Sequence, residues 1–284
     1  SALFRDEKAL DDGCQTELSI DELIFTACRG GWPSALFKNS DKSKLLVAQS
    51  YFEGLCREDI SNIDGKTRDE TVTTLLLRSY ARNISTTAAN TSILRDIRAN
   101  TDIGETTFYE YVAALKKLFV IQDIEAWCPA IRSKSSIQSG NKREFVDPSL
   151  VVSALGVEPD YFNLDLKTFG FIFETLCIRD LKIYSNALGG RISYYRDRYG
   201  LEADCVLHLR DGKYALIEFK LGSSEIDEGA KHLNEIEKLV EEYNKTEKQC
   251  LLRAPDLKIV ITGTQYGYKR PDGVYVVPIG CLRD

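Results

Sequence analysis

The sequence predicts a chain of several parts, α-helical in its first half and α/β in its second half, with a central mixed sheet in the last part. Two observations carry this prediction. Apolar residues recur at helical spacing up to about residue 118, whereas strand-length runs of β-branched and aromatic residues dominate after residue 190. The 284 residues also provide enough length for two or three modest domains.

Composition excludes several kinds of protein. A net charge of −6 and a pI near 5.3 argue against a protein that binds nucleic acid over its whole surface. Any site for a polyanion must therefore be a local basic patch. Eight scattered cysteines without a CxxC pair, and only two histidines, predict free thiols in a reducing cytoplasm rather than a zinc site. No apolar run reaches about 18 residues, which predicts that no segment spans a membrane.

The first part, residues 1–64, has the pattern of helices. SIDELIFTACRGGWPSAL (19–36) opens with a serine N-cap and a glutamate three residues later, and its helix should end at the Gly-Gly-Trp-Pro breaker. KLLVAQSYFEGLCREDI (44–60) is a second amphipathic helix. Both helices would expose apolar faces if they stood alone, so we expect them to pack on a neighbour.

The second part, residues 65–128, is predicted to hold three helices, at 68–83, 91–100 and 106–118, and then an apolar strand at 119–127. The last two helices are joined by a tight Thr-Asp-Ile-Gly turn. Two short helices joined in this way and followed by a strand are typical of a winged helix-turn-helix. We therefore predict a winged helix over this part of the chain.

The third of these helices would be the recognition helix. Its candidate nucleic-acid contacts are, for a groove, Thr106, Thr107 and Tyr109 and, for phosphates, Lys116 and Lys117. Residues 66–125 nevertheless contain eight basic and eight acidic residues, and Glu105 and Glu110 lie on this helix. Docking of a protein partner therefore stays an alternative to DNA binding.

Residues 129–150 form a polar, serine-rich link and the most basic stretch of the chain. Its cations are Arg132, Lys134, Lys142 and Arg143. We predict a loop or an extended wing that leads into the last domain. Arg132 and Lys134 join the candidate nucleic-acid contacts.

The last part, residues 151–284, alternates helices and strands. The predicted helices are 165–188 and 224–248, and the predicted strands are 190–198, 201–209, 213–221, 257–263 and 273–279. This order predicts an α/β domain with a central mixed sheet flanked by helices.

The hairpin formed by 201–209 and 213–221 carries charges within core-like sequence. Glu218 and Lys220 alternate onto one face of their strand, and the Asp-Gly turn brings Asp204 within reach of them. Such a site suits Mg²⁺, with Asp204 and Glu218 as ligands and Lys220 steadying an attacking water or the charge on a phosphate.

Glu174 interrupts an apolar run on the preceding helix, where an unpaired carboxylate would be costly to bury. It is a fourth candidate catalytic residue, which would anchor a water or a second ion. The alternative is an ion pair with Arg179 or with another basic neighbour.

A helical glutamate, an aspartate on a hairpin strand and Glu-x-Lys on the next strand together resemble the PD-(D/E)xK nuclease-like superfamily. The chain departs from that motif at Ala203, where the superfamily has proline. More narrowly, seven segments resemble the C-terminal portion of prokaryotic AAA-type ATP-binding proteins: CRGGWPSAL, TTFYEYVAALKKLFVIQDIEAW, PAIRSKSSIQ, FVDPSL, TFGFIFETLCIRDL, YYRDRYGLEADCVLHLRDGKYALIEFKLG and DGVYVVPIG. The resemblance implies a restriction-endonuclease-like α/β domain at 151–284 and a helical remnant of the ATPase lid at 1–64.

The resemblance also raises the question of ATP. Gly65-Lys66-Thr67 imitates the end of a phosphate loop, but that motif needs glycine at position 60, where the chain has isoleucine. We predict a polar loop there, so ATP would bind only through an upstream module. Arg29 would either reach a phosphate from the lid or cap its own helix beside Gly30.

Two functions follow from the sequence. The first is Mg²⁺-dependent hydrolysis of nucleic acid at the hairpin, coupled to ATP use in the full protein. The second is a non-catalytic module that binds DNA or a protein and is driven by the upstream ATPase. In the second case the charges of the hairpin form a satisfied ion cluster.

Overall fold

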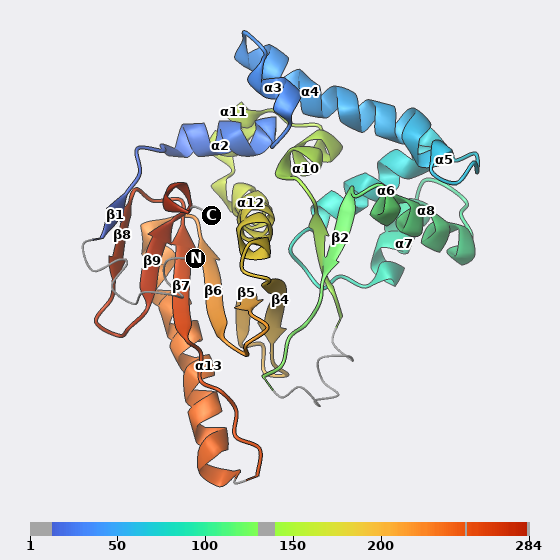
Figure 1. The fold of residues 1–284 in the computed structure, drawn as a ribbon. Helices are drawn as coiled ribbons and strands as arrows, with labels where there is room; N and C mark the ends of the chain where they lie inside the picture. Colours follow the sequence, from blue (N-terminus) through green and yellow to red (C-terminus); the bar gives the residue numbers. More distant parts are fainter. Residues whose placement is uncertain (1–12, 130–139, 248, 283–284) are drawn as a thin grey trace. The chain divides into compact units, whose positions relative to one another are not determined.

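The computed structural model describes residues 13–129, 140–247 and 249–282 (Figure 1). The chain forms two compact units, each assembled from separate stretches of sequence. We call them the helical unit, residues 24–123 and 140–176, and the sheet unit, the described residues of 1–23, 124–139 and 177–284.

The helical unit follows the helix pattern of the sequence. Its elements are α3 (Pro33–Leu36), α4 (Asp41–Gly54), a π-helical turn (Leu55–Asp59), α5 (Ile60–Asn62), α6 (Glu70–Arg82), α7 (Asn90–Arg98), α8 (Glu105–Lys117), β2 (Ile121–Ile124), β3 (Lys142–Phe145), α10 (Pro148–Leu155) and α11 (Pro159–Leu164). Two further helices, α2 (Ile20–Arg29) and α12 (Leu166–Asn186), have residues in both units, as does β2 through its last residue, Ile124. The predicted helices at 68–83, 91–100 and 106–118 are confirmed as α6, α7 and α8.

Polar side chains begin these helices at the predicted places. The Glu22 N–H donates to Ser19 Oγ at 3.2 Å and the Ser19 N–H donates to Glu22 Oε2 at 2.9 Å, which is the expected capping box of α2. At the other end of α2, Arg29 Nε donates to the carbonyl of Gly30, the residue just after the helix, at 3.3 Å.

Two segments far apart in the sequence meet in the helical unit: the Gly-Gly-Trp stretch after α2 and the Asp-Pro-Ser stretch that begins α10. The Gly31 N–H donates to Asp147 Oδ2 at 2.9 Å, and Trp32 Nε1 donates to Ser149 Oγ at 2.8 Å. Asp147 also caps α10 by accepting from the Ser149 N–H at 2.9 Å. Gly30 has a φ of 75°, and a Cβ there would lie 2.5 Å from Asp147 Oδ1. The contact therefore requires glycine at position 30.

β3 pairs with β2 in a two-stranded sheet and consists largely of buried charges. Lys142, Arg143 and Glu144 are 1%, 8% and 0% exposed, in a stretch that the sequence predicted to be a polar, basic loop or extended wing. Residues 142–145 are therefore extended rather than a loop, and the cations Lys142 and Arg143 contact protein groups. Residues 148–150, also expected in the link, begin α10, because Asp147 caps that helix and Pro148 occupies its first turn.

The sheet unit is built on a seven-stranded mixed sheet with the order β1-β8-β9-β7-β6-β5-β4. Its strands are β1 (Cys14–Gln15), β4 (Arg191–Arg196), β5 (Glu202–His208), β6 (Tyr214–Lys220), β7 (Leu257–Thr262), β8 (Tyr266–Lys269) and β9 (Tyr275–Pro278). β6, β7 and β9 run parallel, and the other neighbours pair antiparallel. The predicted mixed sheet and all of its predicted strands are confirmed.

Two strands were not expected. β1 lies in the stretch predicted to be helical, and β8 follows β7 after a short turn. Cys14 pairs with Gly267 and Gln15 with Tyr266, so β1 forms one edge of the sheet. A strand of two residues has no periodicity of its own, and this one exists only through its partner near the other end of the chain.

The long acidic helix α13 (Ile226–Thr246) covers one face of this sheet (Figure 1). Its inward stripe is Ile226, Ala230, Leu233 and Ile236, and these side chains share one buried cluster with residues of β5, β6, β7 and β9. Asp227, Glu228, Glu241 and Glu242 of this helix are exposed, whereas Glu237 pairs with Lys258 of β7. The helix expected at 224–248 is therefore confirmed, and its apolar stripe accounts for its position.

Three further expectations concern single segments. Residues 63–69 form the predicted polar loop, in which Lys66 Nζ contacts Glu110 Oε1 at 2.7 Å. All eight cysteines are free thiols. Within the described ranges, none of the helices combines the length and the apolar composition that crossing a bilayer requires.

Candidate functional site

The hairpin of β5 and β6 brings Asp204, Glu218 and Lys220 to one end of the sheet. The antiparallel register sets Cys205 opposite Ile217, so Asp204 follows one step further, toward Glu218. Alternation along β6 then places Glu218 and Lys220 on the face that α13 covers. The structure therefore brings together the three hairpin residues that the sequence nominated.

A β-bulge shapes the position of Asp204. Ser193 pairs with Val206 and Tyr195 pairs with Ala203, so two residues of β5 lie opposite one residue of β4. Asp204 is one of the two. Bulges of this kind bend a strand and re-aim a side chain, and they are common beside functional sites.

Direct contacts hold the cluster together. Lys220 Nζ lies 3.1 Å from Glu218 Oε2, and His232 Nδ1, on α13, lies 3.7 Å from Glu218 Oε1. Asp204 Oδ2 accepts from the Phe219 N–H at 2.9 Å. Glu218 is only 2% exposed. Its carboxylate is thus buried beside a cation and an imidazole.

α13 approaches the cluster through a glycine. A Cβ on Gly229 would lie 3.2 Å from Lys220 Cε and 3.4 Å from Glu218 Cβ. The absence of a side chain at Gly229 lets the helix pass closely over β6. The helix covers Glu218, whereas Asp204 is half-buried.

The charges of the cluster act on Lys220. Burial alone would lower the pKa of Lys220, but the carboxylates of Glu218, Asp204 and Glu228 outweigh that effect and raise the pKa above its ordinary value. Lys220 therefore stays protonated at neutral pH. In that state it can neutralise negative charge but cannot accept a proton.

The two carboxylates fit the preference of Mg²⁺. This ion binds one or two carboxylates together with waters and phosphate oxygens, and Asp204 and Glu218 supply such donors from neighbouring strands. Within residues 13–129, 140–247 and 249–282, no set of three or more His, Cys, Asp and Glu side chains is arranged to hold a metal ion. A metal at the hairpin would therefore rely on these two carboxylates, water and substrate.

Glu174 lies on α12, in the part of that helix that belongs to the helical unit. It accepts from Lys142 Nζ at 2.7 Å, and the side chains of Lys142 and Glu174 are 2% and 12% exposed. Arg179, the other partner considered from the sequence, contacts Asp180 at 2.8 Å. The ion pair with a basic neighbour is thus present, with Lys142 as that neighbour.

His232 and Lys142 were not nominated from the sequence. His232 comes three residues after Gly229 and directly before Leu233, so the apolar stripe of α13 could have indicated that it lies near the sheet. Lys142 offers no comparable signal, because it stands in a polar stretch and its partner lies 32 residues later.

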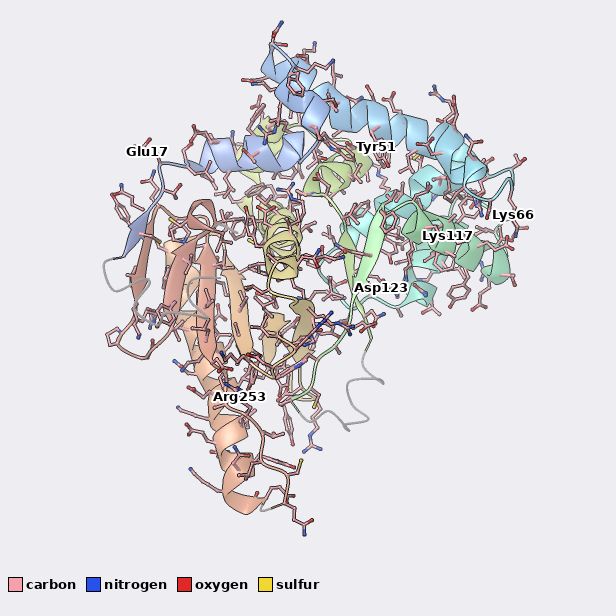
Figure 2. All side chains as sticks on the ribbon, in the orientation of Figure 1. Glu17, Tyr51, Lys66, Lys117, Asp123 and Arg253 are labelled. Carbon is pink, nitrogen blue, oxygen red and sulfur yellow. The ribbon has the colours of Figure 1, made fainter. Side chains whose placement is uncertain are left out.

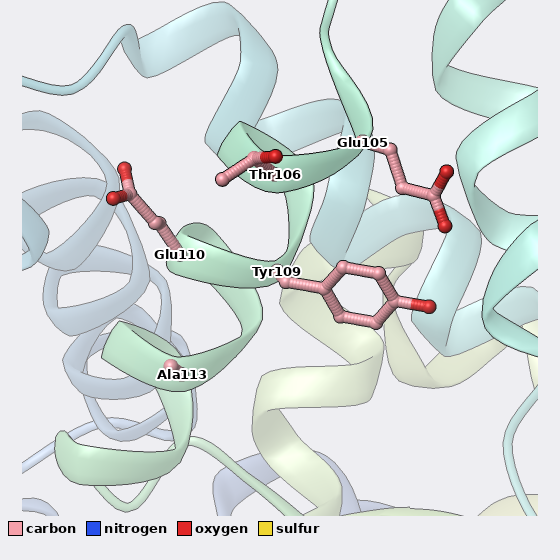
Figure 3. A pocket seen from close by; sticks show the side chains of 5 residues that line it. All are labelled: Glu105, Thr106, Tyr109, Glu110 and Ala113. Carbon is pink, nitrogen blue, oxygen red and sulfur yellow. The ribbon is translucent and has the colours of Figure 1, made fainter.

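The predicted groove contacts lie on the outer surface of α8. Thr106 and Tyr109 line an open hollow together with Glu105, Glu110 and Ala113 (Figure 3). Tyr109 is 44% exposed, and Thr107 is exposed as well. The carboxylates of Glu105 and Glu110 in this hollow would repel a phosphate. A contact with a nucleic-acid groove would therefore depend on the hydroxyl groups of Thr106 and Tyr109.

The two lysines at the end of α8 have different environments; Figure 2 labels Lys117 and Asp123, the partner of Lys116. Lys116 Nζ contacts Asp123 Oδ2 at 2.5 Å, while Lys117 is exposed. Burial alone would raise the pKa of Asp123, but hydrogen bonds from Lys116 and Asn141 and the charge of Arg143 hold it below its ordinary value. Lys117 is therefore the better placed of the two for a phosphate. Arg132 and Lys134 lie outside the described residues.

A family model for a domain of unknown function, DUF8612, matches residues 20–161, half of the chain. The chain belongs to the DUF8612 family. The DUF8612 region contains α8 and the contact between Gly30 and Asp147. A second model, for the domain of unknown function DUF4143, matches residues 169–282 and includes the Asp204 cluster. The searches of curated proteins and of solved structures give no match.

Proposed function

We propose that the sheet unit is a metal-dependent nuclease-like domain that hydrolyses phosphodiester bonds in nucleic acid. The observation that carries the proposal is the meeting of Asp204, Glu218 and Lys220 at the bulged end of the hairpin. Two carboxylates beside one ammonium group provide hard oxygen ligands and a fixed positive charge, which phosphoryl chemistry requires. The resemblance to the PD-(D/E)xK superfamily supports the same function.

Each residue has a distinct role in this proposal. Asp204 and Glu218 would hold Mg²⁺, which polarises the phosphate and activates water when bound. Lys220 would stabilise the negative charge that develops on the phosphate, and its contact with Glu218 holds the ammonium group in position. The bulge would aim Asp204 toward the same space.

We also propose that this chain is part of a larger, AAA-type ATP-binding protein. The DUF4143 match supports a place at the C-terminal end of an AAA-type ATP-binding protein, because this domain is often found in the C-terminal regions of AAA ATPases. ATP would bind in the upstream module, and the first helices of the chain would be the end of its lid.

A second candidate function is a non-catalytic module that binds DNA or a protein and is driven by the ATPase. The burial of Glu218 favours it, because both carboxylate oxygens face basic side chains and little of the group meets solvent. Glu218, Lys220 and His232 would then form an ion cluster that supports the fold and binds no metal. In that case α6, α7, α8, β2 and β3 would act as a winged helix, and α8 would present the binding surface.

We expect the full chain to cut single- or double-stranded DNA or RNA with Mg²⁺ or Mn²⁺, and Asp204→Asn and Glu218→Gln to lower the cutting rate about 100-fold or more. Asp211→Asn, in the exposed turn of the same hairpin, is the matched control and should cut like the wild type. Gel analysis of labelled oligonucleotides measures the rates. No cutting by the wild type, or equal cutting by Asp204→Asn, contradicts catalysis at this cluster.

For the second function, we expect Lys117→Glu to weaken DNA binding and to lower the slope of log K against log salt by about 1. Lys38→Glu reverses another exposed lysine of the helical unit and serves as the control. Lys116→Glu is less suitable, because it also breaks the contact with Asp123. Fluorescence anisotropy measures the affinity and the salt slope. If Lys117→Glu and Lys38→Glu both bind DNA like the wild type, only a protein partner is left for α8.

A further inference from the structure

The loop between β4 and β5 presents an exposed aromatic ring beside the cluster. Tyr199 is 80% exposed. Arg196 pairs with Glu202 where the loop joins the two strands, and Asp204 comes two residues after Glu202 on β5. The ring therefore stands at the same end of the sheet as Asp204, Glu218 and Lys220.

Hydrogen bonds give this loop a defined shape. Asp197 Oδ1 accepts from the N–H groups of Tyr199 and Leu201 at 2.8 and 2.9 Å, and the Asp197 N–H donates to the Leu201 carbonyl at 2.9 Å. Gly200 supplies the left-handed turn, with a φ of 90°. Leu201 packs against the buried cluster beneath α13. Tyr199 is thus held outward by an anchored loop.

Arg198 lies over the exposed ring. Its Cζ is 4.7 Å from the ring centroid of Tyr199, and its Nη2 donates to the Tyr199 hydroxyl at 2.6 Å. A ring held with a guanidinium group combines the two partners that unpaired nucleotides use, a flat surface for the base and a cation for the phosphate.

We infer that Tyr199 and Arg198 bind one unpaired base and its phosphate, and thus that the substrate of the cluster is single-stranded nucleic acid. The inference rests on the proposed nuclease function and adds its substrate class. Bases within a duplex already stack on one another, so only an unpaired base can stack on Tyr199. Asp197 and Glu202 balance the charges of Arg196 and Arg198, so stacking rather than net charge should dominate this contact.

The test uses the full chain in EDTA, which separates binding from metal-dependent cutting. Oligonucleotides of DNA and of RNA carry 2-aminopurine, whose fluorescence falls when it stacks, and each is tested single-stranded and as a duplex. Tyr199→Ala should weaken single-strand affinity on the order of 10-fold and remove the quenching, while Tyr199→Phe keeps both. Tyr266→Ala removes another exposed tyrosine of the sheet unit, 60% exposed, and should bind like the wild type.

The outcomes separate this inference from the nuclease proposal. Unchanged single-strand binding by Tyr199→Ala, or equal quenching with the duplex, overturns the inference even if Asp204→Asn abolishes cutting. Quenching that depends on Tyr199 in a wild type that never cuts supports the binding site and rejects the nuclease. A wild type that neither binds nor cuts overturns both, and the DNA and RNA arms identify which strand is preferred.

Discussion

Replacing Gly30 by alanine is expected to lower the free energy of unfolding by about 3–5 kcal/mol. Gly30 has a φ of 75°, a conformation that strains any residue with a Cβ. The added Cβ would also lie 2.5 Å from Asp147 Oδ1 and 2.8 Å from Ser149 Cβ. Relief of this clash would displace Asp147, which caps α10 and accepts from the Gly31 N–H.

Gly65→Ala is a matched control for Gly30→Ala. Gly65 has a similar φ of 71°, but a Cβ there would meet no atom within 4 Å, so we expect a loss of about 1 kcal/mol from backbone strain alone. The chain contains two tryptophans, so a Trp127→Phe background leaves Trp32, which contacts Ser149, as the fluorescent reporter. Urea unfolding followed at Trp32 compares the variants, and equal losses at the two glycines would argue against the packing explanation.

Lys142→Met is expected to lower the free energy of unfolding by about 3–5 kcal/mol. The substitution removes the buried cation that Glu174 contacts, and the Glu174 carboxylate then stays buried without this partner. Lys44→Met removes an exposed pair with Asp41, whose side chain is 72% exposed, and should cost less than about 1 kcal/mol. Urea unfolding of the full chain measures both. A loss as small as that of Lys44→Met would mean that the buried pair contributes little.

The double variant Lys142→Met/Glu174→Leu tests what Glu174 does. Apolar groups of similar volume can replace a buried pair at little cost, so we expect most of the lost stability to return. If the double variant is folded and cuts nucleic acid like the wild type, Glu174 supports the fold and has no part in the site. A folded double variant without activity would return Glu174 to the catalytic residues.

The local sequence pattern was sufficient to predict most of the helices and strands. The capping signals at Ser19, the helical spacing of α6 to α8 and the Asp-Gly turn between β5 and β6 all act within a few residues, so a single stretch contains the information. The same holds for part of the candidate site. Alternation alone places Glu218 and Lys220 on one face of β6, and the turn brings Asp204 toward them.

Other features arise only when distant segments meet. The two-residue strand β1, the contact of Gly30 with Asp147 and the pair of Lys142 with Glu174 each join residues whose own neighbourhoods predict nothing of the kind. The polar stretch around Lys142 did not indicate that its side chain is buried, because burial is a property of the packed unit and not of a stretch of sequence.

The sequence by itself determined the order of most helices and strands, the mixed sheet and the candidate residues of the hairpin. Only the tertiary structure decided their surroundings: the bulge at Asp204, the close passage of α13 over β6 at Gly229, and the contact of His232 with buried Glu218. The physical reason is that the spacing of apolar residues and the residues of turns are local properties of the sequence, whereas burial and electrostatics depend on which segments pack together.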